Sequence, residues 1–144
     1  MAVFAEEAWR AKVMASTGLT DLIGTRLSPW GASERDVFPY GTYYRLPSDA
    51  SVNLSNAASH MTVRLQADWY SRDVGEVMDI GDFARLATDS YIGAVTVGST
   101  SLRVKIKFTG DNLTPFNEGD GADSLIYRLT QEYVVGHNIT PASV

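Results

Sequence analysis

The sequence predicts an α+β domain over residues 1–144, in which a mainly antiparallel sheet of four to five strands carries two helices on one face. Three observations predict this class: stretches with apolar residues at helical spacing, stretches that alternate apolar and polar residues, and 44% hydrophobic residues in 144. Alternating strands belong to sheets with one solvated face, and helices commonly cover the other. A chain of this length buries about two-thirds of its surface, which suffices for one core. No internal repeat or linker divides it.

The first helix is predicted over Val3–Ala15, because apolar residues recur there at helical spacing and neither glycine nor proline interrupts them. Leu19–Gly24 predicts one more turn, which a glycine closes because glycine tolerates the left-handed conformation of a C-cap. The next segment, Thr25–Val37, contains a proline, a glycine and a polar run. We therefore expect irregular structure there, with at most a short strand near Arg26–Ser28.

Two strands are predicted in the middle of the chain. Tyr40–Leu46 is aromatic and β-branched and follows a proline directly, which fits a strand at an edge or entry position. Ser48–Ser59 is small and polar and is expected to form a loop. From Met61 to Tyr70 apolar and polar residues alternate without a break, so this segment predicts a strand with one buried face.

A second helix is predicted over Val74–Ser90. Asp73 is placed to cap its first turn, and Glu76 three residues later completes a pattern that resembles a capping box. The spacing predicts one buried stripe, made of Val77, Ile80, Phe83, Ala84 and Ala87. Acidic residues lie outside that stripe, at Glu76, Asp79, Asp82 and Asp89.

The last third of the chain predicts a hairpin, a loop and a final strand. Ala94–Val97 and Leu102–Phe108 are strand-like and flank Gly98–Ser101, a glycine-containing link of hairpin length. Gly110–Asp123 is acidic and rich in glycine and asparagine, so we expect a loop. Apolar and polar residues alternate again from Ser124 to about Val135, which predicts the last strand.

Charge and missing residue types exclude several classes of protein. Twelve basic and 17 acidic residues give a net charge of −5, which disfavours a general nucleic-acid binder because such proteins neutralise phosphates with Lys and Arg. The absence of cysteine excludes disulfide scaffolds, cysteine-bound zinc, iron–sulfur clusters and thiol nucleophiles. No apolar run approaches the roughly 20 residues of a membrane helix. The first residues lack the basic region of a signal peptide, so we expect folding in a cytoplasm and no membrane partner.

Residues that commonly carry catalysis or bind metals are sparse. The two histidines, His60 and His137, have no ligand-like neighbour at helical spacing. Gly110–Asp123 has the composition of a metal-binding loop, but its spacing does not fit the calcium-loop pattern. No nucleophile-elbow motif occurs, although a catalytic triad assembled in space stays open. We expect no cofactor, no metal and no enzyme activity; a small enzyme or ligand-binding domain is the alternative.

The outward positions of the predicted strands carry basic side chains, namely Arg64, Arg103, Lys105, Lys107 and Arg128. Three interpretations of this face stay open. It can be a solvated face whose charges prevent aggregation, a surface that contacts an acidic protein surface, or a surface that contacts passing DNA.

Four short blocks, taken together, resemble the tail-completion or tail-terminator proteins of long-tailed bacteriophages and related gene-transfer particles. In chain order they are Leu22–Leu27, Phe38–Gly41, Arg64–Ser71 and Tyr127–Tyr133. The likeness covers nearly the whole chain. It implies a small α+β subunit that has no catalytic activity and no cofactor. Such subunits assemble into a ring, usually a hexamer, in the tail or neck of the virion. The resemblance also implies that assembly takes place in the host cytoplasm. The long Ser48–Ser59 and acidic Gly110–Asp123 segments depart from a typical member.

The resemblance also implies partners. Such a ring sits on the last ring of the tail tube protein, stops tube growth, and offers a surface to the head–tail connector or stopper protein. DNA is then met only as the genome that passes through the channel. The departing segments leave open whether the chain is this terminator or a head-completion (stopper) ring of the neck.

A ring whose subunits join head to tail needs two unlike surfaces on each subunit. We expect the basic sheet face to meet an acidic surface on the second helix and the acidic loop, formed by Glu76, Asp79, Asp82, Asp89, Asp111, Glu118, Asp120 and Asp123. A basic channel lining would grip DNA, whereas an acidic one would let it slide. The hypothesis therefore places the basic residues at subunit contacts.

Overall fold

The structure is a computed structural model that describes residues 5–29, 37–46, 61–117 and 125–137. These residues form three helices, α1 (Ala5–Val13), α2 (Thr17–Ile23) and α3 (Val74–Thr88). They also form six strands: β1 (Leu27–Pro29), β2 (Tyr40–Arg45), β3 (Met61–Ser71), β4 (Ile92–Val97), β5 (Thr100–Asn117) and β6 (Leu125–His137). The loop predicted over Ser48–Ser59 lies outside the described residues. No helix in the described ranges is long and apolar enough to span a membrane.

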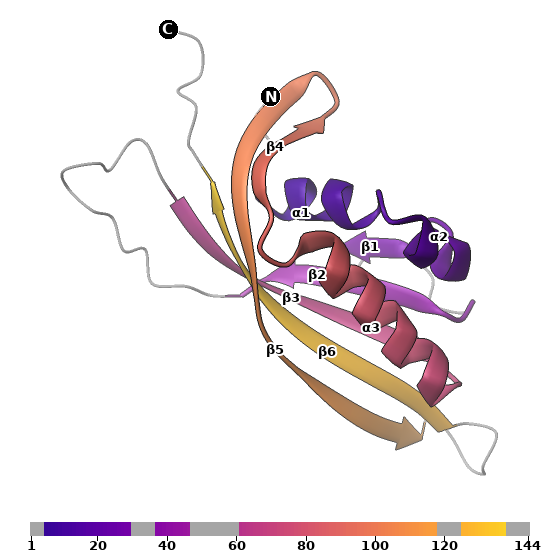
Figure 1. The fold of residues 1–144 in the computed structure, drawn as a ribbon. Coiled ribbons are helices and arrows are strands. Elements are labelled where there is room, and N and C mark those ends of the chain that lie inside the picture. Colours follow the sequence, from indigo (N-terminus) through magenta and orange to yellow (C-terminus); the bar gives the residue numbers. More distant parts are fainter. Residues whose placement is uncertain (1–4, 30–36, 47–60, 118–124, 138–144) are drawn as a thin grey trace, which may run out of the picture.

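The six strands form one twisted sheet in the order β1-β2-β3-β6-β5-β4, with the three helices together on one face (Figure 1). Every neighbouring pair is antiparallel except β1 and β2, which are parallel. The α+β class is thereby confirmed. The prediction of four to five strands and two helices was too low, because the described chain also contains β1 and α2 as ordered elements.

Local capping explains where the helices begin. The Ser16 hydroxyl accepts a hydrogen bond from the backbone N–H of Leu19 and so caps α2, while Gly24 at its end has φ of 60°. The Asp73 carboxylate accepts a 2.9 Å bond from the backbone N–H of Gly75, which confirms the predicted cap of α3. The expected capping box is replaced by a relay through Ser71: its hydroxyl donates to Glu76 and accepts from the backbone N–H of Asp73.

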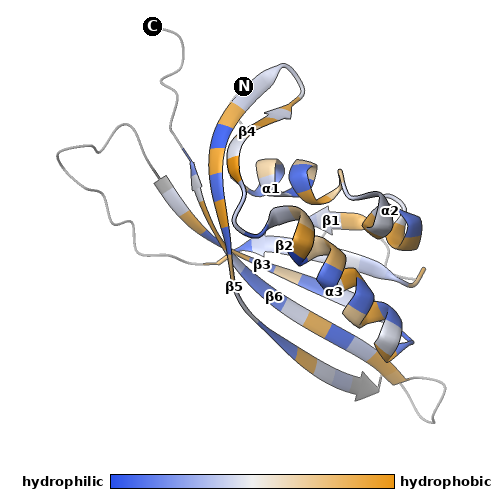
Figure 2. Ribbon diagram, in the orientation of Figure 1, coloured by the Kyte–Doolittle hydropathy of each residue, from blue (hydrophilic) through white to orange (hydrophobic). Residues whose placement is uncertain are grey.

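The core lies between the helices and the sheet, where hydrophobic residues concentrate (Figure 2). Trp9 of α1 is at its centre, with ring centroids 5.4 to 6.3 Å from three other rings, those of Tyr43, Trp69 and Tyr133. Trp9 is fully buried, so α1 is fixed to the middle of the sheet by one large side chain.

α3 faces the sheet through Val77, Ile80, Gly81, Ala84 and Thr88. Phe83 was predicted in that stripe, but it lies outside the core against Gly18 of α2. The reason is Gly81: a β-carbon there would collide with the Leu129 side chain, so the missing side chain lets α3 approach β6 along this line. The buried stripe is therefore centred on the glycine rather than on the aromatic residue.

β5 corrects the sequence prediction most strongly. The predicted hairpin with β4 is present, but the strands are longer and Val97 pairs with Thr100 around a two-residue turn. The expected loop from Gly110 onward is instead a continuation of β5, which pairs with β6 as far as Asn117 and Leu125. A bulge between Phe108 and Gly110 separates the two halves. Residues 118–123 of that prediction lie outside the described residues.

Candidate assembly interface

The outer face of the sheet, opposite the helices, carries a basic strip that we define as Arg64, Arg103, Lys105 and Lys107. On β5 the three basic residues alternate with the buried Leu102, Val104 and Ile106, so their exposed side chains point away from the core. Lys107 pairs with Val134 of β6, which pairs with Arg64 of β3. The register therefore brings four of the five predicted basic residues to one end of the outer face.

Most of the charge in the basic strip is uncompensated. Arg64 forms an ion pair with Glu132 across the β3–β6 boundary, with 3.3 Å between Nη2 and Oε1. Arg103, Lys105 and Lys107 form no ion pair with any residue that the structure describes. Repulsion between these three exposed cations is thus relieved only by solvent or by an acidic partner.

Arg128 was expected in the same group, but the structure places it elsewhere. It pairs with Tyr70 and Thr114, six residues along β6 from Val134. At the rise of a β-strand this corresponds to about 20 Å. Arg128 is also half-buried there, so it is not part of the basic strip.

The centre of the outer face is a polar cluster around Asp68. The Asp68 carboxylate accepts bonds from the Thr130 hydroxyl at 2.7 Å and the Gln66 amide at 3.2 Å. Tyr40 and Tyr70 stack beside it with centroids 4.8 Å apart. Burial raises the pKa of Tyr44, and the negative charge of Asp68 raises it further. The charge of Asp68 is therefore used in hydrogen bonds inside the subunit and is not available to a partner.

The helix side of the molecule carries an acidic rim, which we define as Asp79, Asp82 and Asp111. Asp79 and Asp82 are exposed on α3. Asp111 is exposed on β5 and pairs with Gln131, whose side chain points to α3, so Asp111 shares that face. Asp82 lies 3.7 Å from Arg85, while Asp79 and Asp111 form no ion pair within the described part of the chain.

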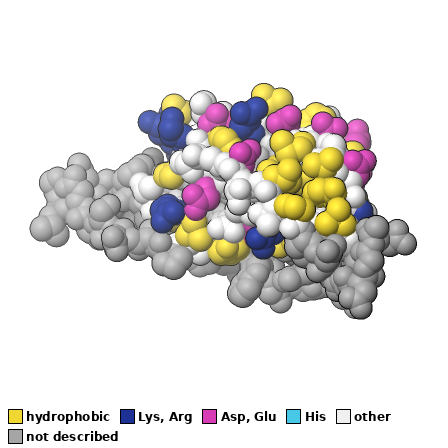
Figure 3. All heavy atoms as spheres, turned by 90° about the horizontal axis from the view of Figure 1, so that it is seen from below, with side chains coloured by type: hydrophobic (Ala, Val, Ile, Leu, Met, Phe, Trp, Pro, Cys, Tyr) yellow, Lys and Arg dark blue, Asp and Glu magenta, His cyan; other side chains and the backbone are white. Residues whose placement is uncertain are grey.

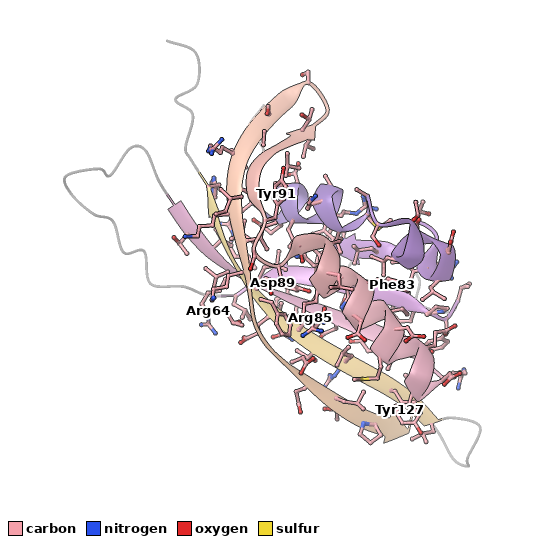
Figure 4. The ribbon with its side chains drawn as sticks, viewed as in Figure 1. Arg64, Phe83, Arg85, Asp89, Tyr91 and Tyr127 are labelled. Carbon is pink, nitrogen blue, oxygen red and sulfur yellow. The ribbon has the colours of Figure 1, made fainter. Side chains whose placement is uncertain are left out.

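Two other predicted acidic residues are used inside the subunit. Glu76 accepts the hydroxyl bond of Ser71, and Asp89 accepts a 2.9 Å bond from the backbone N–H of Phe108. Figure 4 shows Asp89 and Arg85 on the side of α3 toward β5, whereas Arg64 lies away from the helices. The remaining predicted residues, Glu118, Asp120 and Asp123, lie outside the described residues.

Sequence reasoning missed an apolar ledge beside the acidic rim, which we define as Val74, Met78 and Leu113. Their side chains are between 37% and 41% exposed. Seen from the end of the molecule where α3 begins and β5 ends, hydrophobic side chains gather on the surface with acidic side chains along their border (Figure 3). The signal in the sequence was the spacing of Val74 and Met78, one helical turn apart and outside the predicted stripe.

The described residues offer little for catalysis or metal binding. They contain no cluster of three or more His, Asp or Glu side chains that could hold a metal ion. His137 is buried at the end of β6, and His60 lies outside the described ranges. A groove of about 390 Å³ lies between α1, α2 and α3. Two of its polar groups are engaged, since Lys12 lies 4.1 Å above the Tyr91 ring and Ser16 caps α2.

Comparison with known proteins gives a match of fold and none of sequence. No protein-family model matches the chain, and no curated protein matches it. Its fold is similar to that of a chain in the solved structure described as "Virion of native gene transfer agent (GTA) particle", with a TM-score of 0.63 and 12% identity. The likeness covers 95% of this chain and 99% of that one. The two chains share one fold.

Proposed function

We propose that the chain is a structural subunit of a virion or gene-transfer particle, and that it assembles into a tail-terminator ring. The observation that carries this proposal is the fold likeness to a chain of a gene transfer agent virion particle, which spans 95% of this chain and 99% of the other. The four sequence blocks that resemble tail-completion proteins point to the same class.

The charge arrangement supports assembly into a ring. The basic strip and the acidic rim lie on opposite faces of one sheet, and residues of both sets lack ion-pair partners in the described subunit. Opposite faces of unlike charge permit head-to-tail contacts between copies, and such contacts close into a ring when the rotation fits. We propose a hexamer that ends the tail tube, contacts the tail tube protein and the head–tail connector, and lets the genome pass without a cofactor or catalysis.

The mass in solution tests this proposal. Analytical ultracentrifugation and negative-stain imaging should show a ring, either with the chain alone or after addition of tail tubes. A pull-down with tail tube protein and with portal-side protein then separates the two neck positions: a terminator retains the tube, whereas a stopper retains the portal side. A compact monomer that stays monomeric with both partners present would overturn the structural role.

Charge reversal tests the contact between subunits. The double variant Lys105→Glu/Lys107→Glu should shift the population from rings to monomers, because two exposed cations of the basic strip become anions facing the acidic rim. Arg72→Glu is the control, since Arg72 is exposed at the far end of β3 from Arg64. Intact rings in the double variant would count against the basic strip as a subunit contact.

A further inference from the structure

We propose that the apolar ledge seats the outer face of the β4–β5 hairpin of a neighbouring copy, with Ile92 as the apolar residue that enters it. This inference rests on the proposed ring and names the residues that meet in it. The ledge is offered by Val74, Met78 and Leu113, and the hairpin face by Ile92, Arg103 and Lys105.

The ledge residues come from two elements but form one surface. Leu113 pairs directly with Leu129 in the sheet, and Gly81 of α3 lies against the Leu129 side chain. Arg85 extends from α3 over the ring of Phe108 in β5, with 5.7 Å to the centroid. Met78 precedes Arg85 by seven residues, which is two helical turns, and therefore lies on the same side of α3.

Val74 lies one further turn along that side of α3. The helix thus presents Val74 and Met78 toward the lower half of β5, where Leu113 stands. The described subunit leaves about two-fifths of each of these apolar residues exposed, with 41% at Val74, 40% at Met78 and 37% at Leu113. Exposed apolar side chains that gather with a polar border mark protein contact sites more often than isolated ones do.

The hairpin presents a matching surface on the other side of the sheet. Ile92 is 60% exposed and pairs directly with Lys105, so a large apolar side chain stands beside a basic one. Ala94 pairs with Arg103 in the same way one step further along. The inner face of the hairpin is held in the core by Val95 and Leu102, so its outer face is presented by a packed element.

Charge favours a second copy as the occupant. The ledge is bordered by Asp79 and Asp111, neither of which has an ion-pair partner among the described residues. The hairpin carries Arg103 and Lys105, which also lack one there. Contact between the two surfaces would place an apolar centre on an apolar centre and acidic side chains beside basic ones, which is the arrangement of a specific interface.

The two surfaces cannot meet within one chain. Met78 lies on the helix side of the sheet, whereas Ile92 points from the outer side. Each copy therefore offers its ledge to one neighbour and its hairpin to the other. A contact of this heterologous kind repeats around a ring until it closes.

Site-specific cross-linking tests this contact, and the chain has no cysteine of its own to interfere. Met78→Cys and Ile92→Cys are made as separate proteins, mixed, assembled and oxidised with diamide. The expected product is a disulfide-linked dimer on a non-reducing gel. The double variant should give a ladder of linked copies that stops at the number of subunits in the ring.

Leu86→Cys is the matched control, because Leu86 is strongly exposed on α3 but lines the groove beside α1 and α2. Mixed with Ile92→Cys, it should cross-link at least tenfold less. Rings that assemble but give no link between Met78→Cys and Ile92→Cys, or an equal link from Leu86→Cys, would overturn this contact and leave the ring itself standing. A wild-type chain that never assembles would instead overturn the proposed function.

Discussion

The indole Nε1 of Trp69 donates a hydrogen bond of 2.9 Å to Oε1 of Gln131, and both side chains are buried. The hydroxyl of Tyr133 donates to the same oxygen at 2.9 Å, and Nε2 of Gln131 donates to the carbonyl of Gly81 at 3.0 Å. One amide thus links β3 and β6 to the backbone of α3. Gln131 therefore adds hydrogen bonds to the apolar packing that holds α3, and with it the helical part of the ledge and of the acidic rim, on the sheet.

Gln131→Leu should lower the free energy of unfolding by about 2–5 kcal/mol, because it leaves the buried indole N–H of Trp69 without its partner and removes two further buried hydrogen bonds, from the Tyr133 hydroxyl and to the Gly81 carbonyl. Urea denaturation followed by circular dichroism measures this change. Asn112→Ala is the control, since the Asn112 side chain is exposed and, within the described part of the chain, bonds only to the Thr114 hydroxyl. A loss in the leucine variant no larger than in the control would show that Gln131 does not organise the core.

Gly81→Ala should destabilise the protein although alanine favours helices. The added methyl group would collide with Leu129 and approach Nε2 of Gln131 to 3.1 Å, and overpacking of this kind costs about 1–3 kcal/mol. Gly75→Ala in the same helix is the matched control, because the one described side chain that its methyl group would meet is the Asp73 carboxylate, at 3.4 Å. That variant should gain several tenths of a kcal/mol. Equal effects at the two positions, read from their thermal midpoints, would contradict the close approach of α3.

The fold class could be predicted from the sequence because the alternating residues from Thr62 to Tyr70 do face opposite sides of the sheet. The lower half of β5, from Gly110 to Asn117, could not be predicted in the same way. Its glycine, asparagines and proline have low strand propensity, and only the long partner strand β6 holds them extended. The prediction that Phe83 is buried was also wrong. Hydrophobic spacing cannot show that α3 approaches the sheet most closely at a glycine, Gly81.

The sequence predicted that basic side chains of β5 share the outer face, but not how strand register groups them with the other charged residues. The alternation along β5 placed Arg103, Lys105 and Lys107 on one face correctly. Strand register decides which other cations lie near these three. It places Arg64 beside them and Arg128 near the other end of the sheet. Asp89 carries the same charge as Asp79, yet a backbone hydrogen bond already occupies it. Register and hydrogen bonding depend on the whole fold, so no local pattern could supply them.

Stability should fall at alkaline pH through Tyr133. Burial raises the pKa of Tyr133 above its usual value near 10. In the unfolded chain the hydroxyl ionises near pH 10, while in the folded protein it keeps its proton. Its contribution is therefore complete below about pH 10 and is lost above it, by about 1.4 kcal/mol per pH unit. Burial raises the pKa of Tyr43 as well and adds to the loss in the same direction.

Urea unfolding from pH 8 to pH 11 measures that slope. In Tyr133→Phe the slope above pH 10 should be smaller, even though the variant starts from a lower stability because Gln131 loses a donor. Absorbance of tyrosinate gives an independent reading, since the folded protein should ionise fewer tyrosines at pH 11 than the urea-unfolded chain. Parallel slopes in the two proteins would show that Tyr133 is not the group responsible.

Two charge-reversed variants should assemble together although neither assembles alone. In Lys105→Glu/Lys107→Glu the charge of the strip residues without an ion pair changes from +3 to −1, and in Asp79→Lys/Asp111→Lys the charge of the rim residues without an ion pair changes from −2 to +2. In a ring of either variant alone, the outer face of each copy would meet a helix face of the same charge at every subunit contact, and this repulsion disfavours assembly. In a mixture, the acidic outer face of one variant meets the basic helix face of the other, and the two unaltered faces meet at the next joint.

The mixed assembly must therefore alternate the two variants around the ring. A ring with an even number of subunits, such as the proposed hexamer, closes with every joint complementary, and native mass spectrometry should show equal numbers of the two chains. A ring with an odd number always keeps one repulsive joint and should give open chains instead. Rings with random composition, or rings from either variant alone, would show that these two faces do not meet.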